Sequence, residues 1–406
     1  MAHEEIPKEL VVNPTMEVGA GFKLRTRNGG SRQSILTMKE QPELCSLLIA
    51  LASDGWSSDR FGEIPANLLS QLLEMGIIVP KDQIPDEVYF HCSLDQPLVE
   101  LIPSKHRRLR PSNNADISEF VVNPGVHVQV GPELPTALAE RAPFRDHFQP
   151  GDTIIWVEDR ATTVLAPYWL NSRFVGMMNR LVEGQISPAE LPPEVSERLA
   201  YIGALIHKDH DESRVTERQE SCARSRSQLQ AEQYTVLRDM IRPLQLAALR
   251  NYFRVLDQKG YLVKEPSRGS QSINRYIWHN ESIARFVHYQ ITKLVNQVVP
   301  EPIKPSYTYL STYKSGAILP RHTDREQCVW NLSLLIDTNP EMGLSDSWPI
   351  NLEIEKEVKA VRLEMGDGVL YRGTDIPHWR DALTEGHTVT LIFCHFVPFD
   401  FKESLY

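Results

Sequence analysis

Three residues of metal-ligating types in the C-terminal part of the chain constrain its fold most strongly. His322 and Asp324 are two residues apart, so their side chains would point to the same face of a β-strand. His378 follows much later in the chain. Two imidazoles and one carboxylate form the facial ligand set that holds non-haem Fe(II) and leaves coordination positions open. The pattern predicts a metal site, and the alternative is three unrelated polar residues at strand ends.

The segments around these residues have the sequence pattern of β-strands. From about residue 303, apolar and polar residues alternate in short runs, and the runs are separated by Gly and Pro turns. Many short strands of this kind are typical of a double-sheet jelly roll. The predicted strands are 307–313, 329–336, 350–354, 361–365, 369–371 and 388–397. We therefore expect an α+β chain whose C-terminal part is a double-stranded β-helix, or jelly roll, with supporting helices.

Composition excludes several classes of protein. A chain of 406 residues predicts two or three domains, and the net charge of −10 argues against binding nucleic acid by general phosphate neutralisation. No apolar run reaches the roughly 18–20 residues of a membrane span, and the acidic N-terminus does not resemble a signal peptide. The five cysteines are scattered without a CxxC spacing. We expect a cytoplasmic protein with neither a membrane nor a nucleic-acid partner.

The N-terminal half contains an internal repeat. Leu10-Val-Val-Asn-Pro14 is echoed by Phe120-Val-Val-Asn-Pro124. Each motif is followed by strand-like residues, an apolar helix, a Pro-led second helix that ends at Gly, and a short apolar strand. The first helices are predicted at 44–53 and 174–182, the second helices at 65–76 and 192–203, and the closing strands at 77–79 and 204–206. Pro in the first turn and Gly after the last are the expected helix boundaries.

The order of strands, two helices and a closing strand is winged-helix-like. It resembles the small peptide-recognition domains that accompany enzymes modifying ribosomally made peptides, which bind a leader peptide as an added strand. The alternatives are a packing or dimerisation unit without a ligand, or a DNA-binding winged helix, which the few basic residues of the second helices oppose. The basic, turn-rich stretch 104–114 between the copies is interpreted as a linker, or as a site for phosphate or an acidic peptide.

The middle of the chain is predicted to be helical. Residues 208–232 are polar and highly charged, and we interpret them as a helical linker. Apolar residues from Leu237 to Phe253 suggest an amphipathic helix that packs on a sheet. A second helix is expected over 281–295, with Asn280 as its N-cap.

Residues of about 233–400 resemble the Fe(II)/2-oxoglutarate-dependent dioxygenases, in their prolyl 4-hydroxylase-like branch. The residues that carry the resemblance are Tyr313-Lys-Ser-Gly316, Leu319-Pro-Arg-His322-Thr-Asp324, Met365-Gly-Asp-Gly-Val-Leu-Tyr371, and Pro377-His378 followed by Gly386. The resemblance covers a little under half of the chain.

The resemblance implies that His322, Asp324 and His378 bind Fe(II) and carry the catalysis. It also implies 2-oxoglutarate and O₂ as co-substrates, with ascorbate as a candidate auxiliary reductant. Such enzymes decarboxylate 2-oxoglutarate to succinate and hydroxylate a C–H bond. Related halogenases leave the carboxylate position vacant for chloride, so Asp324 favours hydroxylation.

The same resemblance proposes residues that bind 2-oxoglutarate. In this branch a tyrosine near the position of Tyr313 hydrogen-bonds the co-substrate, and the alternative is a core residue. Arg or Lys nine or ten residues after the distal histidine usually meets the far carboxylate, but His387 and Thr388 occupy those positions. A carboxylate prefers a charged, bidentate partner. The candidates for this role are Arg380, Arg362, Arg372, a protonated His387, and the hydroxyl of Thr390.

These observations predict four segments: winged-helix-like repeats at 1–103 and 118–207, a helical linker at 208–232, and an oxygenase domain at 233–406. The predicted function is hydroxylation of an amino-acid residue, a peptide or a small specialised metabolite, in a chain that is a candidate homodimer. One alternative is a binding or sensor protein on a catalytically degenerate jelly roll. Others are a peptide-recognition protein that uses the N-terminal repeats, and a transcription factor.

Overall fold

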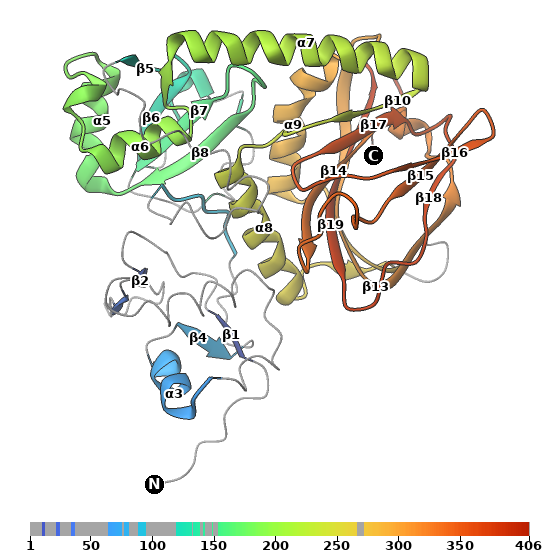
Figure 1. Cartoon of the computed structure of the whole chain (residues 1–406), viewed down its shortest axis with the longest axis horizontal. Coiled ribbons are helices and arrows are strands. Elements are labelled where there is room, and N and C mark those ends of the chain that lie inside the picture. Colours follow the sequence, from blue (N-terminus) through green and yellow to red (C-terminus); the bar gives the residue numbers. More distant parts are fainter. Residues whose placement is uncertain are drawn as a thin grey trace.

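The structure is a computed structural model, shown in Figure 1. It describes residues 10–12, 22–24, 34–36, 64–74, 77–80, 88–94, 119–131, 133–138, 141–142, 148, 153–265 and 272–405. The predictions for the strand near residues 16–18, the helix at 44–53 and the linker at 104–114 lie outside these residues.

The C-terminal part is an antiparallel sheet that curls on itself (Figure 1). Its strand order is β10-β17-β14-β19-β13-β18-β15-β16, and β12 and then β11 extend it beside β13. The strands are β10 Tyr234–Leu237, β11 Val263–Lys264, β12 Ile273–His279, β13 Ile303–His322, β14 Trp330–Asn339, β15 Ile350–Ile354, β16 Glu357–Val361, β17 Gly368–Arg372, β18 His378–Arg380 and β19 Thr388–Pro398. This arrangement confirms the predicted jelly roll.

β13 joins the two halves of the roll. Its first part pairs with β12 and β19, and its last residues pair with β18. Every residue of β19 from Val389 to Val397 is buried, because one face looks into the roll and the other is covered. The sequence of a strand that is covered on both faces is a nearly continuous run of apolar residues, without alternation of apolar and polar residues.

Two helices, α8 (Pro243–Gln258) and α9 (Ser282–Asn296), support this sheet. Arg250 and Arg254 of α8 form ion pairs of 2.8 and 2.5 Å with the buried carboxylate of Asp337 in β14. The helix predicted from Leu237 onward is wrong at its start. Residues 234–237 are strand β10 on β17, and the helix begins at Pro243, the residue type that suits a first helical turn.

The N-cap of α9 also differs from the prediction. Glu281 caps the helix, because its carboxylate accepts the backbone N–H of Ala284 at 2.7 Å. Asn280 instead has a positive φ of 54°, and its side-chain oxygen accepts the backbone N–H of Thr308. Asn is one of the residue types that tolerate this left-handed conformation, so it makes the turn between β12 and the helix.

The second repeat forms a compact α+β unit (Figure 1). A three-stranded sheet of order β6-β7-β8 lies with the pair β5–β9 and two helices. The elements are β5 Phe120–Val122, β6 Val126–Val130, β7 Thr153–Glu158, β8 Leu165–Leu170, α5 Val175–Val182, α6 Pro193–Tyr201 and β9 Leu205–His207. Short 3-10 turns occur at Thr136–Leu138, Ser172–Phe174 and Pro188–Glu190, and in the C-terminal part at Glu326–Cys328.

The described elements of the first predicted repeat are two antiparallel strand pairs, β1–β4 and β2–β3, and one helix. They are β1 Leu10–Val12, β2 Phe22–Leu24, β3 Ser34–Leu36, α3 Ala66–Glu74 and β4 Ile78–Pro80. α6 begins 127 residues after α3, and β9 begins 127 residues after β4. In both units the motif strand pairs antiparallel with the closing strand, Leu10 with Pro80 and Phe120 with His207.

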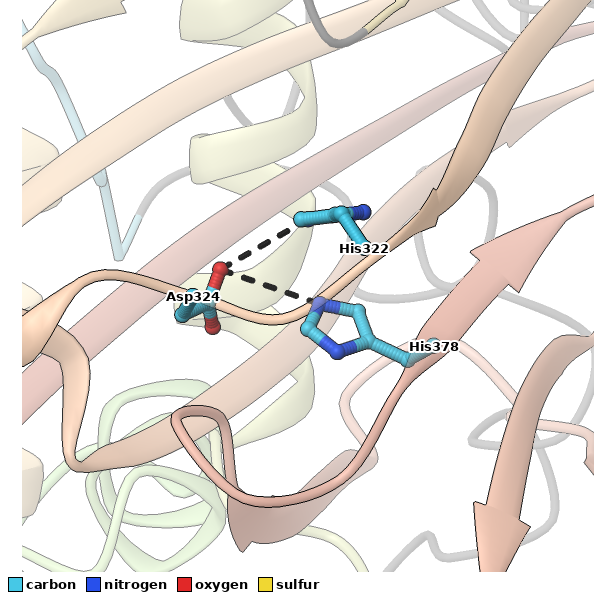
Figure 2. A group of neighbouring side chains, drawn as sticks. All are labelled: His322, Asp324 and His378. Atoms are coloured by element: carbon cyan, nitrogen blue, oxygen red, sulfur yellow. Dashed lines mark ion pairs between the residues drawn. The ribbon is translucent and has the colours of Figure 1, made fainter. Parts of the chain in front are cut away.

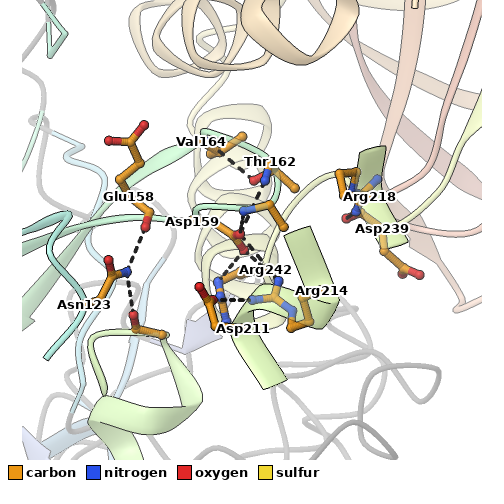
Figure 3. A network of polar contacts seen from close by, with 12 residues as sticks. Asn123, Glu158, Asp159, Thr162, Val164, Asp211, Arg214, Arg218, Asp239 and Arg242 are labelled. Carbon is orange, nitrogen blue, oxygen red and sulfur yellow. Dashed lines mark hydrogen bonds and ion pairs between the residues drawn. The ribbon is translucent and has the colours of Figure 1, made fainter. Parts of the chain in front are cut away.

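A buried acid connects the second unit to the helices that lead into the roll (Figure 3). Asp159 follows β7 and is 4% exposed, and its carboxylate lies 2.8 Å from Arg242 Nε and 3.1 Å from Arg214 Nη2. Arg214 belongs to α7 (Lys208–Glu232), and Arg242 directly precedes α8. Within the part of the chain that the structure describes, no helix has the length and apolar character needed to cross a membrane.

Candidate metal centre and co-substrate cavity

The structure brings His322, Asp324 and His378 together (Figure 2). One ligand atom from each residue lies within 4.8 Å of the other two. The Oδ1 atom of Asp324 is 3.6 Å from Nε2 of His322 and 3.7 Å from Nε2 of His378. The juxtaposition follows from strand pairing, because His322 at the end of β13 is the direct cross-strand partner of His378 in β18.

The hydrogen bonds of both imidazoles leave the same nitrogen available. Nδ1 of His322 lies 2.8 Å from the carbonyl oxygen of Pro320, and Nδ1 of His378 lies 2.9 Å from that of Ile376. A carbonyl can only accept, so each Nδ1 carries the proton and each Nε2 keeps its lone pair. Metal-bound histidines are oriented by this kind of outer hydrogen bond. The donor set therefore fits a cation between Asp324 and the two rings.

Asp324 is held in place by its surroundings. Its backbone N–H donates to the carbonyl of Gly373 at 2.8 Å, and its Oδ2 accepts from the amide of Asn331 at 3.1 Å. Burial by itself raises the pKa of this carboxyl, but the neighbouring imidazoles of His322 and His378 outweigh burial and bring the pKa down to about 2. The carboxylate is therefore ionised at neutral pH, as a metal ligand must be.

A second group shares Asp324. Ligand atoms of Cys328 and His395 also lie within 4.8 Å of that carboxylate and of each other. Burial and then the charge of Asp324 raise the pKa of the Cys328 thiol to about 12, and burial lowers the pKa of His395 to about 4. A protonated thiol is a poor ligand. The group of two histidines and Asp324 is therefore the better metal site.

A small cavity lies beside this centre, inside the roll. Arg380 lines it, two residues after His378 and on the same face of β18. The rest of its lining comes from Leu335, Thr338, Met342, Ser347, Trp348, Leu363, Val389 and Leu391. One cation in an otherwise largely apolar lining is the arrangement that orients an anionic ligand.

The guanidinium of Arg380 is only partly used by the protein. The residue is 2% exposed, and its Nη1 donates to the carbonyl oxygen of Trp348 at 2.8 Å. Its Nε and Nη2 atoms are buried and have no partner among the described residues. Burial lowers the pKa of Arg380 from its usual value. A buried cation without a counter-ion is unfavourable, so these two donors point to an anionic ligand.

Tyr313 packs into the same region. It is completely buried, and its ring lies 5.1 Å from the ring of Trp348 in a T-shaped contact. Its hydroxyl has no hydrogen-bond partner among the described residues. Burial raises the pKa of this hydroxyl, which therefore stays a neutral donor. Tyr313 and Arg380, which were both predicted from the sequence to bind 2-oxoglutarate, therefore lie in the same region of the roll.

The other predicted anchors are not brought to the cavity. His387 lies in the turn before β19, with Nδ1 3.0 Å from the carbonyl oxygen of Glu385. Thr390 points to the opposite face of β19 from Val389, and its hydroxyl lies 3.0 Å from that of Thr312. Arg362 donates to the carbonyl of Ser347, and Arg372 pairs with Asp375 at 2.6 Å.

Sequence reasoning missed several residues that shape the site. Asn331 bonds both Asp324 and the hydroxyl of Tyr371, and the Tyr371 ring lies 5.0 Å from that of His378. A Cβ on Gly373 would collide with Oδ2 of Asp324. Asn331 and His395 are direct partners on β14 and β19, so the strand pattern could have placed them on one face. Nothing in the sequence marks Gly373.

Comparisons with known proteins find similarity among solved structures. No protein-family model matches the sequence, and no curated protein matches it. Among solved structures, a prolyl-4-hydroxylase from Pseudomonas putida is similar over 44% of this chain and 98% of its own, at 14% identity and a TM-score of 0.36. A prolyl hydroxylase from Trichoplax adhaerens, in complex with a fragment of the hypoxia inducible factor oxygen degradation domain, covers 45% of this chain and 91% of its own. Its identity is 13% and its TM-score is 0.37.

HygX from Streptomyces hygroscopicus, with nickel and 2-oxoglutarate bound, is similar over 44% of this chain and 89% of its own, at 11% identity and a TM-score of 0.34. The chain is thus similar, over less than half its length, to two prolyl hydroxylases and to a protein solved with nickel and 2-oxoglutarate bound.

Proposed function

We propose that this chain is a non-haem Fe(II)/2-oxoglutarate-dependent oxygenase. His322, Asp324 and His378 would hold the iron, because their free ligand atoms converge beside a buried cation. An Fe(II) ion held there would supply the chemistry by which O₂ oxidises 2-oxoglutarate to succinate and CO₂ and hydroxylates a C–H bond of the substrate. The substrate class is an amino-acid residue, a peptide or a small metabolite.

Arg380 and Tyr313 would bind the far carboxylate of 2-oxoglutarate. The two unpartnered donors of the guanidinium suit the two oxygens of a carboxylate, and the buried tyrosine hydroxyl adds a neutral donor. The low-dielectric wall around them strengthens the attraction and excludes water. These residues therefore orient the co-substrate, and the nearby histidines and Asp324 position the metal.

One observation carries this proposal: the three candidate metal ligands lie near the guanidinium of Arg380, which has no acidic partner among the described residues. The test is O₂ consumption by the Fe(II)-loaded chain on addition of 2-oxoglutarate, with succinate measured at the end. We expect slow, 2-oxoglutarate-dependent consumption even without the organic substrate. Binding of both iron and 2-oxoglutarate without any succinate would favour the binding or sensor protein instead.

We also propose that residues 1–103 and 118–207 are two copies of one winged-helix-like unit, followed by the linker at 208–232 and the catalytic domain at 233–406. The equal spacing of α3 to α6 and of β4 to β9, with the same strand pairing in both, supports the duplication. Expression of residues 118–406 alone tests this division. It predicts that this fragment folds and consumes 2-oxoglutarate.

A further inference from the structure

Four arginines lie near the candidate metal centre or its cavity. They differ in whether an acidic side chain neutralises the charge of the guanidinium. Arg321 makes a bidentate contact with Glu353, at 3.0 and 2.9 Å. Arg372 pairs with Asp375. Arg380 faces the co-substrate cavity. Arg325, the residue after the ligand Asp324, forms no ion pair with any acid that the structure describes.

Neutral groups hold Arg325 in place. Its Nε donates to the hydroxyl of Tyr307 at 2.8 Å, and its Nη2 donates to the hydroxyl of Tyr309 at 3.3 Å. The guanidinium also lies over the Tyr307 ring, 5.0 Å from its centre. These contacts fix the orientation of the side chain without cancelling its charge. The guanidinium also interacts with the Cys328 thiol, so all of its described partners are uncharged or protonated groups.

A short chain of contacts joins this guanidinium to the metal centre. Tyr307, which accepts from Arg325, lies with its hydroxyl 2.8 Å from Sγ of Cys328. Cys328 and His395 are the two residues that group with Asp324. Arg325 and Arg380 thus reach the centre from different strands, one beside β13 and the other on β18.

Two positive charges, those of Arg325 and Arg285, lie near His279 in a chain of net charge −10. The ring of His279 lies 5.1 Å from that of Tyr307 and 4.9 Å from that of Tyr309. Partial burial lowers the pKa of His279, and the positive charges of Arg325 and Arg285 lower it further. A local positive field at the mouth of a site attracts anionic ligands and orients them.

We propose that Arg325 binds a carboxylate of the organic substrate and so selects carboxylate-bearing molecules. This inference rests on the proposed function, because it places the substrate beside Asp324. The single planar fork of Arg325 matches one carboxylate, and Tyr307 and Tyr309 preorganise it. The co-substrate and the substrate would then each have their own arginine, Arg380 and Arg325.

The test measures binding to the metal-free full-length chain by calorimetry. The probes are N-acetyl amino acids with a free carboxylate, each compared with its primary amide, and amidated peptides that carry an Asp or Glu side chain. We expect one acid series to bind at least about tenfold more tightly than its amides. Preference for N-acetyl acids indicates a terminal carboxylate, and preference for the acidic peptides indicates a side-chain carboxylate.

Variants locate the binding. Arg325→Gln should weaken the acid about tenfold or more and leave the amide unchanged, and Arg325→Lys should restore part of the affinity. Arg321→Gln is the matched control, because the neighbouring guanidinium is already paired with Glu353, and it should bind as the wild type does. Arg325→Gln should weaken binding of the acid by the same factor in a chain that also carries Arg380→Gln, which removes the cation of the cavity.

The proposal is overturned if no acid binds more tightly than its amide, or if Arg325→Gln binds the acid as the wild type does. Dependence on Arg380 alone would also overturn it, since the probes would then report the co-substrate cavity. Iron content and succinate formation, measured separately on the wild type, decide the proposed function. The two claims can therefore fail independently.

Discussion

At the scale of single residues, the space around Asp324 is set by the absence of a side chain at position 373. A Cβ there would collide with Oδ2 of Asp324 and would lie 2.8 Å from the carbonyl oxygen of Cys328. Backbone atoms cannot give way as the end of a flexible side chain can. The position of Asp324, the candidate metal ligand, therefore depends on a glycine that has no metal-binding group of its own.

Gly373→Ala is expected to displace the carboxylate and weaken Fe(II) binding by about tenfold to a hundredfold, the range for changes around a metal ligand. Anaerobic titration with Fe(II) measures this. Gly343→Ala is the control, since a Cβ at that glycine meets nothing within 4 Å. Equal iron affinity in both variants would show that Asp324 tolerates the added methyl group.

Arg380→Gln is expected to weaken 2-oxoglutarate binding by about tenfold or more, because it removes two charge-assisted donors. Iron binding should be retained, and Arg380→Lys should recover part of the loss. Arg372→Gln serves as the control, because Arg372 is paired with Asp375 outside the cavity. Unchanged affinity for 2-oxoglutarate in Arg380→Gln would exclude Arg380 as the anchor.

The sequence predicted the candidate ligand residues, which the structure brings together, but not their surroundings, for a physical reason. Metal-ligating side chains are chemically distinctive, so His322, Asp324 and His378 could be named from type and spacing. Asn331 and Gly373 act through contacts across strands, and no local pattern contains those contacts. Thr390 was assigned by position in the chain, whereas the alternation of β19 turns it away from the cavity.

At the scale of elements, α9 places an unusual residue in the core. His288 is completely buried and lies in a T-shaped contact with Phe396, 4.7 Å between ring centres. Burial lowers the pKa of His288 well below 6.5, and the nearby charges of Arg285 and His395 lower it further. The folded chain therefore keeps this ring neutral in weak acid.

The unfolded chain takes up a proton at this histidine below about pH 6.5, and the folded chain does not. Stability from this group is therefore complete above pH 6.5 and falls as the pH decreases toward the lowered pKa. A loss on the order of 1 kcal/mol is expected between pH 7.5 and 5.5. Urea unfolding at pH 7.5 and at pH 5.5 measures the free energy of unfolding. Its decrease between these two pH values should be smaller in His288→Leu than in the wild type by the contribution of His288. An equal loss in the variant and the wild type would show that His288 titrates normally.

Element boundaries were predictable only where local and long-range signals agreed. The strand predicted at 350–354 coincides with β15. The stretch before Pro243 has apolar residues at helical spacing, but pairing with β17 makes 234–237 a strand. Whether a short apolar segment becomes a strand depends on a partner far away in the sequence, which periodicity does not contain.

At the scale of the whole molecule, the repeated Asn-Pro motif acquires a structural reason. In the second unit, the amide of Asn123 donates to the carbonyl oxygens of Glu158 and Gly203, at 2.9 and 2.8 Å (Figure 3). One side chain thus fastens the end of β7 to the turn between α6 and β9. The sequence showed the motif twice, but only the fold shows which segments it joins.

Asp159 is expected to secure this unit to α7 and α8. Arg214 and Arg242 lower its pKa to about 2 despite burial, which acts in the opposite direction. Asp159→Ala leaves the partly buried Arg242 without its acidic partner and Arg214 with Asp211 alone, and it should destabilise the chain by about 2 kcal/mol or more. Glu220→Ala, which breaks an exposed pair with Arg224 on the same α7, should change stability by less than about 1 kcal/mol.

Denaturant unfolding of the two variants provides the comparison. A loss in Asp159→Ala no larger than that in Glu220→Ala would contradict the role given to the buried acid. The aromatic cluster between the second unit and the roll, with Phe148 5.0 Å from Phe286 of α9, would then be the main connection.

The central claim is that one iron ion binds to His322, Asp324 and His378. The most direct test is the iron content of the anaerobically loaded chain, together with the visible charge-transfer absorption that 2-oxoglutarate induces when it chelates the metal. We predict one Fe(II) per chain in the wild type, with that absorption, and loss of both in His322→Ala and in Asp324→Ala. Full iron content in either variant would contradict the assignment of the site.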